Sequence, residues 1–145
     1  MSKTPAFWDS SALVPVCVDV LASPRARTLL RAFLPVVWWG STVEIYGAIC
    51  RLHRSKEIRD REKQVAVTRL HTISLSWREM LPDNQVRDLA LAILEKYPLR
   101  AADALQLGAS LTWCQGRPTR RTFITADERL ADAARAVGFA VLAFP

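Results

Sequence analysis

A chain of 145 residues, half of them hydrophobic, is long enough to bury a core and is expected to form one domain over residues 1–145. Three scattered cysteines and two histidines argue against a disulfide framework and a zinc site and favour a cytosolic protein, while the lack of a signal-like opening or a long apolar run argues against membrane insertion. The formal net charge of +6 favours a polyanionic partner, although a basic surface alone is weak support for nucleic-acid binding.

Apolar periodicity and turn residues divide the chain into short strands and helices that alternate. In chain order, the predicted elements are a strand over 6–8, a tight turn over 10–14, helices over 15–22 and 23–33, a strand over 36–39, helices over 41–53 and 58–70, an edge strand or extended segment over 72–77, helices over 83–97 and 99–113, a strand over 122–125, a helix over 127–137 and a strand over 139–144. This alternation predicts an α/β fold with a mostly parallel central sheet and helices on both faces.

A few residues with special backbone preferences mark the helix ends. Pro15 cannot donate a hydrogen bond in a helix interior, so we expect it to begin a helix rather than to lie within one. Ser23 is expected to cap the helix that follows it, and Ser41 and Glu44 have the spacing of a capping box. Gly138 is expected to close the last helix.

Four acidic side chains stand at predicted strand ends or helix starts: Asp9, Glu44, Asp103 and Asp127. Three have structural alternatives. Asp9 could cap a turn, Glu44 could belong to the capping box with Ser41, and Asp127 could favour the helix dipole within a capping box over 125–128. A structural role does not explain Asp103 in the same way. It lies about a turn inside its helix among small apolar residues, with no opposite charge at i+3 or i+4. Strand ends in this fold share one edge of the sheet, where ligands bind, so the four carboxylates are expected to meet there.

Carboxylates gathered in this way need a positive partner. Two of them about 4 Å apart repel by roughly 4 kcal/mol at an effective dielectric near 20, which is large against a typical net stability of about 5–15 kcal/mol. No lysine occurs in the four acidic motifs, and Arg100 is the only nearby cation. Mg²⁺ or Mn²⁺ suits carboxylate oxygens and water as ligands. The four acids are therefore predicted to bind the metal and to be catalytic.

A metal site of this kind activates water and holds a phosphodiester. The sequence contains no Ser-His-Asp set, no Cys-His pair with an orienting residue, and neither of the glycine-rich phosphate-binding patterns G-x-x-x-x-G-K-[ST] and G-x-G-x-x-G. Hydrolysis without a covalent nucleophile is the chemistry that remains.

The acidic motifs also resemble those of the PIN domain family, in particular the VapC toxins of VapBC toxin-antitoxin pairs. The similarity spans nearly the whole chain and rests on FWDSSAL over 7–13, VE over 43–44, LRAADALQL over 99–107 and FITADERL over 123–130, of which the last two are the most specific. The resemblance implies a three-layer α/β/α fold, Mg²⁺- or Mn²⁺-dependent endoribonuclease activity and a homodimer. It also implies inhibition by a VapB-like antitoxin whose carboxyl-terminal segment lies across the active-site groove.

The resemblance assigns the metal-binding positions to four residues: Asp9, Glu44, Asp103 and Asp127. Ser11 and Thr125 match the hydroxyl positions that orient carboxylates or water. Gly108 stands where alanine is more usual, so a looser helix is expected there. Asp132 falls on a different face of the last helix and is left out of the site.

A positively charged rim would hold RNA through its phosphates. Eight arginines could form such a rim or could equally be scattered solvated charges: Arg25, Arg27, Arg31, Arg51, Arg54, Arg117, Arg120 and Arg121. RNA-binding proteins often stack unpaired bases on aromatic side chains. However, Trp8, Trp38 and Trp39 fall in predicted strands and are expected in the core.

The leading hypothesis is therefore a metal-dependent endoribonuclease that acts as a toxin. A second hypothesis is a non-catalytic PIN-like module that binds nucleic acid or a protein through its basic surface. A third keeps the nuclease but makes it a housekeeping PIN enzyme that processes RNA or acts on DNA. Saturable stabilisation by Mg²⁺ or Mn²⁺ separates the first from the second, and an antitoxin gene directly upstream separates the first from the third.

Overall fold

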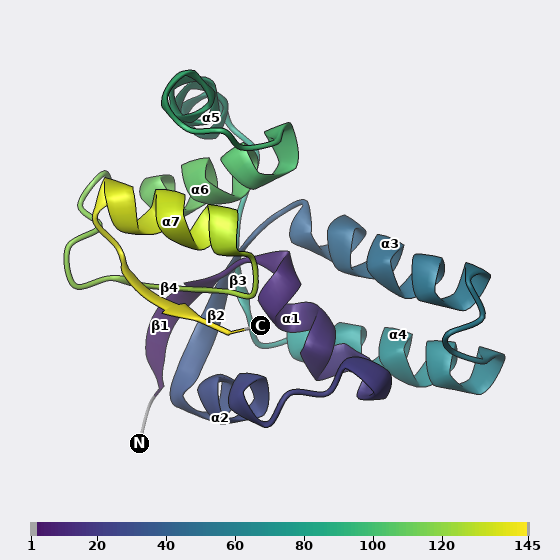
Figure 1. Ribbon diagram of the computed structural model, residues 1–145. Helices are drawn as coiled ribbons and strands as arrows, with labels where there is room; N and C mark the ends of the chain where they lie inside the picture. Colours follow the sequence, from purple (N-terminus) through teal and green to yellow (C-terminus); the bar gives the residue numbers. More distant parts are fainter. Residues whose placement is uncertain (1–2, 145) are drawn as a thin grey trace.

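The computed structural model describes residues 3–144, which form a five-stranded sheet with helices on both faces (Figure 1). The strands are β1 (Thr4–Trp8), β2 (Phe33–Trp38), β3 (Arg78–Met80), β4 (Thr122–Thr125) and β5 (Ala140–Ala143), and they lie in the order β3-β2-β1-β4-β5. Each strand runs parallel to its neighbours. The carboxyl ends of β1, β2 and β4 therefore lie at the same edge of the sheet, where ligands bind in such folds.

Two hydrophobic cores lie on the two faces of the sheet. One layer contains the helices α1 (Ser10–Cys17), α2 (Pro24–Ala32), α3 (Ser41–Arg54) and α4 (Asp60–Ser74), and the other contains α5 (Asn84–Lys96), α6 (Ala101–Trp113) and α7 (Glu128–Val137). Successive side chains of a strand point to opposite faces, so Trp8 packs into the first core and Phe7 into the second. The predicted three-layer α/β/α fold with a parallel sheet is confirmed.

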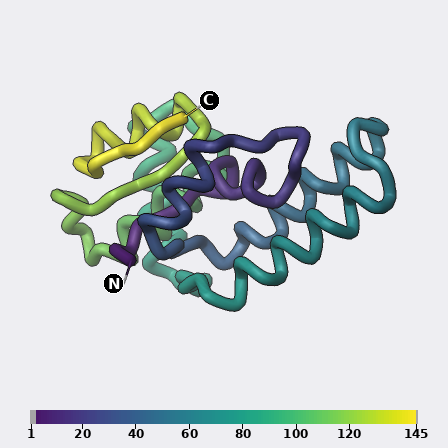
Figure 2. The backbone as a smooth tube through the Cα atoms, turned by 90° about the horizontal axis from the view of Figure 1, so that it is seen from below, coloured from purple at the N-terminus to yellow at the C-terminus, as the bar shows by residue number. Residues whose placement is uncertain are grey.

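The helices α3 and α4 lie side by side and extend beyond the sheet as a helical hairpin (Figure 1 and Figure 2). α4 buries Ala66 and Leu70 and leaves most of its charged side chains exposed. No helix within residues 3–144 has the length and apolar character needed to cross a membrane.

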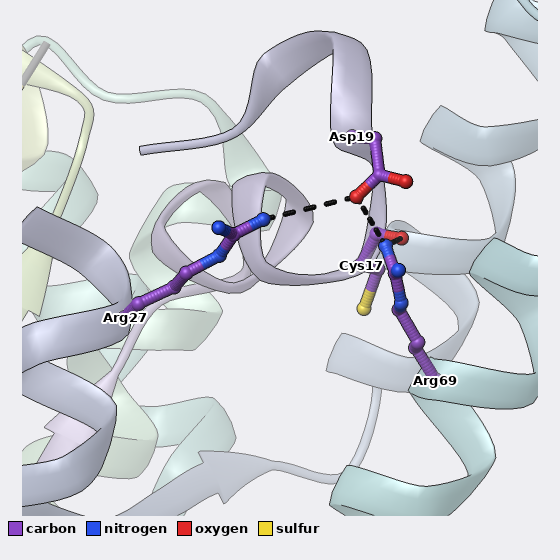
Figure 3. Close-up of polar contacts among 4 residues, drawn as sticks. All are labelled: Cys17, Asp19, Arg27 and Arg69. Atoms are coloured by element: carbon purple, nitrogen blue, oxygen red, sulfur yellow. Dashed lines mark hydrogen bonds and ion pairs between the residues drawn. The ribbon is translucent and has the colours of Figure 1, made fainter. Parts of the chain in front are cut away.

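An ion-pair cluster ties the connection after α1 to α4 (Figure 3). Asp19, in the 3₁₀ turn η1 (Asp19–Leu21), accepts a hydrogen bond of 2.5 Å from Arg69 and lies 3.7 Å from Arg27. The hydrogen bond from Arg69 is the main cause that lowers the pKa of Asp19. Exposed ion pairs contribute little to stability, so we assign this cluster the local role of holding η1 between α2 and α4.

Pro15 lies inside α1 and does not begin a helix, so this prediction is wrong. A proline removes one helical hydrogen bond, but the helix continues beyond it, and the amide of Val18 donates to the carbonyl of Val14 at 3.1 Å. Leu13 and Cys17 of α1 are buried in the core under α1–α4. Packing of this face compensates for the missing hydrogen bond.

Two further predictions about strands are corrected. Residues 72–74 belong to the end of α4 and 75–77 form its exit, whereas the edge strand β3 begins only at Arg78. Trp39 lies beyond the end of β2 and is 51% exposed, so it is not a core residue as expected, while Trp8 and Trp38 are buried.

Gly108 is required by the close approach of α5 to α6 and does not loosen the helix as expected. A Cβ atom at this position would lie 2.8 Å from the carbonyl oxygen of Val86 and 3.2 Å from the amide nitrogen of Ala90. Both of these atoms belong to the backbone of α5, which cannot move away as a flexible side chain can. The glycine therefore permits the contact between the two helices.

We expect Gly108→Ala to lower the free energy of unfolding by about 1–3 kcal/mol, because overpacking of the interface outweighs the better helix propensity of alanine. Urea denaturation followed by circular dichroism measures this change. Gly47→Ala in α3 is the matched control, since its Cβ would meet only the end of the Arg51 side chain at 3.5 Å. This control is expected to be neutral or stabilising, and a Gly108→Ala protein as stable as the wild type would contradict the interpretation.

Candidate active site

The four predicted acids lie at one edge of the sheet, each at the start of a helix. Asp9 follows β1 directly and Asp127 closely follows β4, whereas Glu44 and Asp103 lie in the first turns of α3 and α6. Their carboxylates are close enough to influence one another. Burial is the main cause that raises the pKa of Glu44, and the charges of Asp9 and Asp103 raise it further. The structure therefore brings these acids together from four separate parts of the chain.

Asp9 is the most deeply buried of the four, with 3% of its surface exposed. It occupies the N-cap position of α1, where its side chain accepts no helix-capping hydrogen bond, although a backbone hydrogen bond from Ser11 in the following turn lowers its pKa. Its Oδ2 atom also accepts hydrogen bonds from the hydroxyls of Ser11 and Thr125, the second at 2.8 Å. Burial raises the pKa of Asp9, the two hydroxyls lower it, and the charge of Asp127 raises it.

Backbone amides fix the two hydroxyls in their roles as donors. Oγ of Ser11 accepts a hydrogen bond of 3.0 Å from the amide of Ala126, and Oγ1 of Thr125 accepts one of 3.0 Å from the amide of Asp127. Each hydroxyl has a single hydrogen to donate, and this hydrogen points to Asp9. Ser11 and Thr125 thus connect the end of β4 to the end of β1 and orient the carboxylate between them.

Glu44 is held by a residue that sequence analysis missed. Its Oε1 atom accepts a hydrogen bond of 2.7 Å from Nε2 of Gln106, which also donates to Oγ of Ser41 at 3.0 Å. The capping box predicted for Ser41 and Glu44 is wrong, because the N-cap of α3 is Gly40 and Ser41 already lies in the helix. The only signal in the sequence was a polar side chain at a position where the apolar face of the helix would be expected.

The pKa of Glu44 is raised to about 7. Burial is the largest cause, the hydrogen bond from Gln106 opposes it, and repulsion by Asp9 and Asp103 adds to it. In the absence of a cation, this carboxyl group is therefore partly protonated at neutral pH.

Asp103 and Asp127 each accept a backbone hydrogen bond, which gives both of them part of a structural role. Asp127 is the N-cap of α7, since its Oδ1 atom accepts a hydrogen bond of 3.0 Å from the amide of Leu130. The expected capping box over 125–128 is therefore wrong, and the observed cap leaves the second carboxylate oxygen of Asp127 available. Asp103 is half-buried, and its pKa is raised first by burial and then by the charges of Asp127 and Asp9, while Arg100 lowers it. Its surroundings favour a bound cation over an isolated charge.

A surface pocket of about 440 Å³ opens beside Asp103 and Asp127. Arg100 and Arg129 also line it. A pocket that contains both carboxylates and guanidinium groups can take a phosphate group, because arginine binds its oxygens directly and a cation held by the acids neutralises the remaining charge. Arg129 was missed in the sequence, where an arginine in the first turn of a helix resembles an ordinary surface charge.

The donor set fits Mg²⁺ or Mn²⁺. Within residues 3–144, no three His, Cys, Asp or Glu side chains are arranged so that together they could hold a metal ion, so the fit concerns one or two carboxylates with water. Mg²⁺ in proteins commonly keeps several waters and is bound through one or two carboxylates. Carboxylates that lie near one another and repel are compatible with this open mode of binding, whereas zinc or a soft metal would need nitrogen or sulfur ligands.

The eight arginines of the expected rim do not surround the acids. Those of α2 and of the loop over 114–121 lead into the amino ends of β2 and β4, which is the edge of the sheet opposite the site (Figure 1). Those of α3 lie at its last turn, far from Glu44 in its first. They are Arg25, Arg27, Arg31, Arg51, Arg54, Arg117, Arg120 and Arg121.

Comparison with protein-family models and with curated proteins gave no match. Three solved structures are similar: a toxin-antitoxin complex from Klebsiella pneumoniae (16% identity, TM-score 0.58, covering 84% of this chain and 86% of that one), PAE2754 from Pyrobaculum aerophilum (14%, 0.65, 97% and 89%) and FitAcB from Neisseria gonorrhoeae (16%, 0.62, 94% and 96%). At such low identity the likeness establishes the fold. The predicted PIN-like fold is therefore confirmed over nearly the whole chain.

Proposed function

We propose that this chain is a Mg²⁺- or Mn²⁺-dependent endoribonuclease that acts in the cytosol as the toxin of a toxin-antitoxin pair. The observation that carries the proposal is the meeting of Asp9, Glu44, Asp103 and Asp127 at the carboxyl edge of a PIN-like sheet, with raised pKa values at the first three. Repelling acids weaken a fold, and such clusters are characteristic of functional sites. Backbone hydrogen bonds give Asp9, Asp103 and Asp127 part of a structural role, but they do not remove the repulsion among the acids.

The four acids would hold the ion, which when bound lowers the pKa of a coordinated water and neutralises charge on the phosphodiester. The protein's own groups position the participants. Ser11 and Thr125 fix the orientation of Asp9. Arg100 and Arg129 are placed to contact phosphate oxygens, which would hold the RNA backbone at the pocket. The arginines at the opposite edge of the sheet have no part in this step.

A VapB-like antitoxin is the proposed partner. The similarity of the fold to that of a chain in a toxin-antitoxin complex supports this assignment. A homodimer is also proposed, on the family resemblance, and Leu91 and Leu94 offer an apolar surface for association because they lie one turn apart on α5 and are 57% and 38% exposed.

The direct test is cleavage of single-stranded RNA by the purified chain, with Mn²⁺, with Mg²⁺ and with a chelator. We expect cleavage only when one of the two metals is present, and full recovery when Mn²⁺ is added back after chelation. DNA of the same sequence and length is the matched substrate, and preferential cleavage of DNA would favour the housekeeping alternative. RNA binding without cleavage and without any response to metal would contradict the proposal and favour a non-catalytic module.

A further inference from the structure

Gln106 makes two hydrogen bonds that join the two helical layers of the protein at the edge of the sheet. It lies in α6, one turn after Asp103, and is completely buried. Its Nε2 atom donates to Glu44 and Ser41, which both belong to the first turn of α3 in the other layer. Because residues three apart share one face of a helix, α6 presents an acid and an amide to the same site.

The amide has a defined orientation. In the structure its nitrogen end faces Glu44. An ionised carboxylate can only accept hydrogen bonds, so the charged form of Glu44 matches this orientation of Gln106. Its Oε1 atom is then buried, and it has no hydrogen-bond partner among residues 3–144. An unpaired buried oxygen is unfavourable for folding. A leucine or methionine would avoid this penalty but would leave Oγ of Ser41 and Oε1 of Glu44 without their donor, so the glutamine is matched to the two polar groups that it contacts.

An amide suits the task of orienting a carboxylate that must bind a cation. It fixes one oxygen of Glu44 by a hydrogen bond but carries no charge, so the carboxylate keeps its attraction for a metal ion. A lysine or arginine in the same place would neutralise it. The second oxygen, Oε2, accepts no hydrogen bond from any residue in the described range and is available to a ligand.

We propose that Gln106 is a positioning residue, which holds Oε1 of Glu44 so that its free oxygen is presented to a divalent cation at the acidic site. This inference rests on the proposed metal-dependent function and identifies how one ligand of that site is oriented. Hydrogen-bonded partners of metal ligands commonly act in this way, and their replacement weakens metal binding or activity by about 10–100-fold.

The test replaces Gln106 by methionine, which has a similar length but no N–H donor, and by leucine as a second variant. Calorimetric titration with Mn²⁺ is expected to give an affinity weakened by about tenfold or more. With RNA as substrate, kcat should fall while KM is unchanged, because the RNA contacts are intact. The metal-free melting temperature should change little, because losing the donor to Ser41 and Glu44 opposes the gain from removing the unpaired Oε1. Gln85→Met, the same change at an exposed position of α5, should match the wild type in all three measurements.

A purely structural role predicts different results. A Gln106→Met protein that melts at lower temperature but binds Mn²⁺ with wild-type affinity would overturn the inference and leave the proposed function standing. Failure of both variants to fold would overturn it as well, because the amide would then be a requirement of the fold. Wild-type protein that neither binds Mn²⁺ nor cleaves RNA would overturn the proposed function itself, together with this inference.

Discussion

The Asp103→Asn variant is expected to lose RNA cleavage and yet to remain folded, with a metal-free form somewhat more stable than the wild type. Asparagine keeps the shape of the side chain but removes the charge that attracts the cation. If the lost metal interaction is worth about 4 kcal/mol in the transition state, the rate falls by about 10³-fold. Removing one of several repelling carboxylates is expected to raise the free energy of unfolding of the metal-free protein by about 1 kcal/mol.

Single-turnover cleavage of RNA and thermal denaturation of the same preparations measure the two effects. Asp132→Asn is the matched control, because Asp132 is an exposed aspartate of α7 whose ion pair with Arg135, at 3.4 Å, lies on the surface. This control should cleave and melt like the wild type. Retention of cleavage by Asp103→Asn would remove Asp103 from the site, and loss of cleavage together with a lower melting temperature would indicate a structural role instead.

The parts of the site that could be predicted are those encoded by neighbouring residues. Asp9 and Asp127 each follow a short apolar run that is typical of a buried strand. Parallel strands place their carboxyl ends at the same edge of the sheet. The hydroxyls of Ser11 and Thr125 lie within two residues of these acids. The fold class followed from the same alternation of strands and helices.

The parts that could not be predicted depend on contacts between distant segments. Gln106 meets Glu44 across 62 positions of sequence, and nothing near either residue indicates that the two helices approach there. Pro15 is tolerated in α1 because the rest of the helix packs into a core that sequence patterns do not specify. In the sequence, Gly108 indicates only a less stable helix. The close approach of the α5 backbone, which requires a glycine at this position, is a contact between segments distant in the sequence.

The residues near the acids in sequence and those that reach them from distant segments share one property, which is that most of them are uncharged hydrogen-bond donors. The fold gathers acids whose mutual repulsion it neutralises only in part, through Arg100, and it uses uncharged groups, two hydroxyls and one amide, to orient Asp9 and Glu44. Neutral donors direct a carboxylate without competing for a cation. The stability of the protein should therefore depend on whether protons or metal ions occupy the site.

The metal-free protein is expected to lose stability as pH rises from about 5 to about 8. The pKa of Glu44 is about 7 in the folded protein against an ordinary value of 4.5, so over this range the folded state binds more protons than the unfolded state. Stability then falls with increasing pH. The raised pKa values of Asp9 and Asp103 act in the same direction. Allowing for solvent screening, Glu44 alone should account for a loss of about 1–2 kcal/mol.

Mn²⁺ should reverse this loss, because the cation replaces the protons that the acids would otherwise hold. At about 100 times its Kd, a ligand that binds only the folded state adds about 2.7 kcal/mol to the free energy of unfolding. The gain should be large near pH 8 and small near pH 5, where protons compete for the same oxygens. Urea denaturation at several pH values, with Mn²⁺ and with a chelator, measures both effects.

Glu44→Gln separates the contribution of Glu44 from that of the other acids, because it removes the carboxyl group whose pKa is raised to about 7 and keeps the size of the side chain. This variant should show a shallower fall in metal-free stability with pH and a smaller gain from Mn²⁺, whereas Asp132→Asn should behave like the wild type. A metal-free protein whose stability stays constant or rises between about pH 5 and about pH 8 would mean that neither burial nor mutual repulsion raises the pKa values of these acids. In that case the cation would have no electrostatic cost to relieve, and the physical basis for a metal site at this edge of the sheet would be lost.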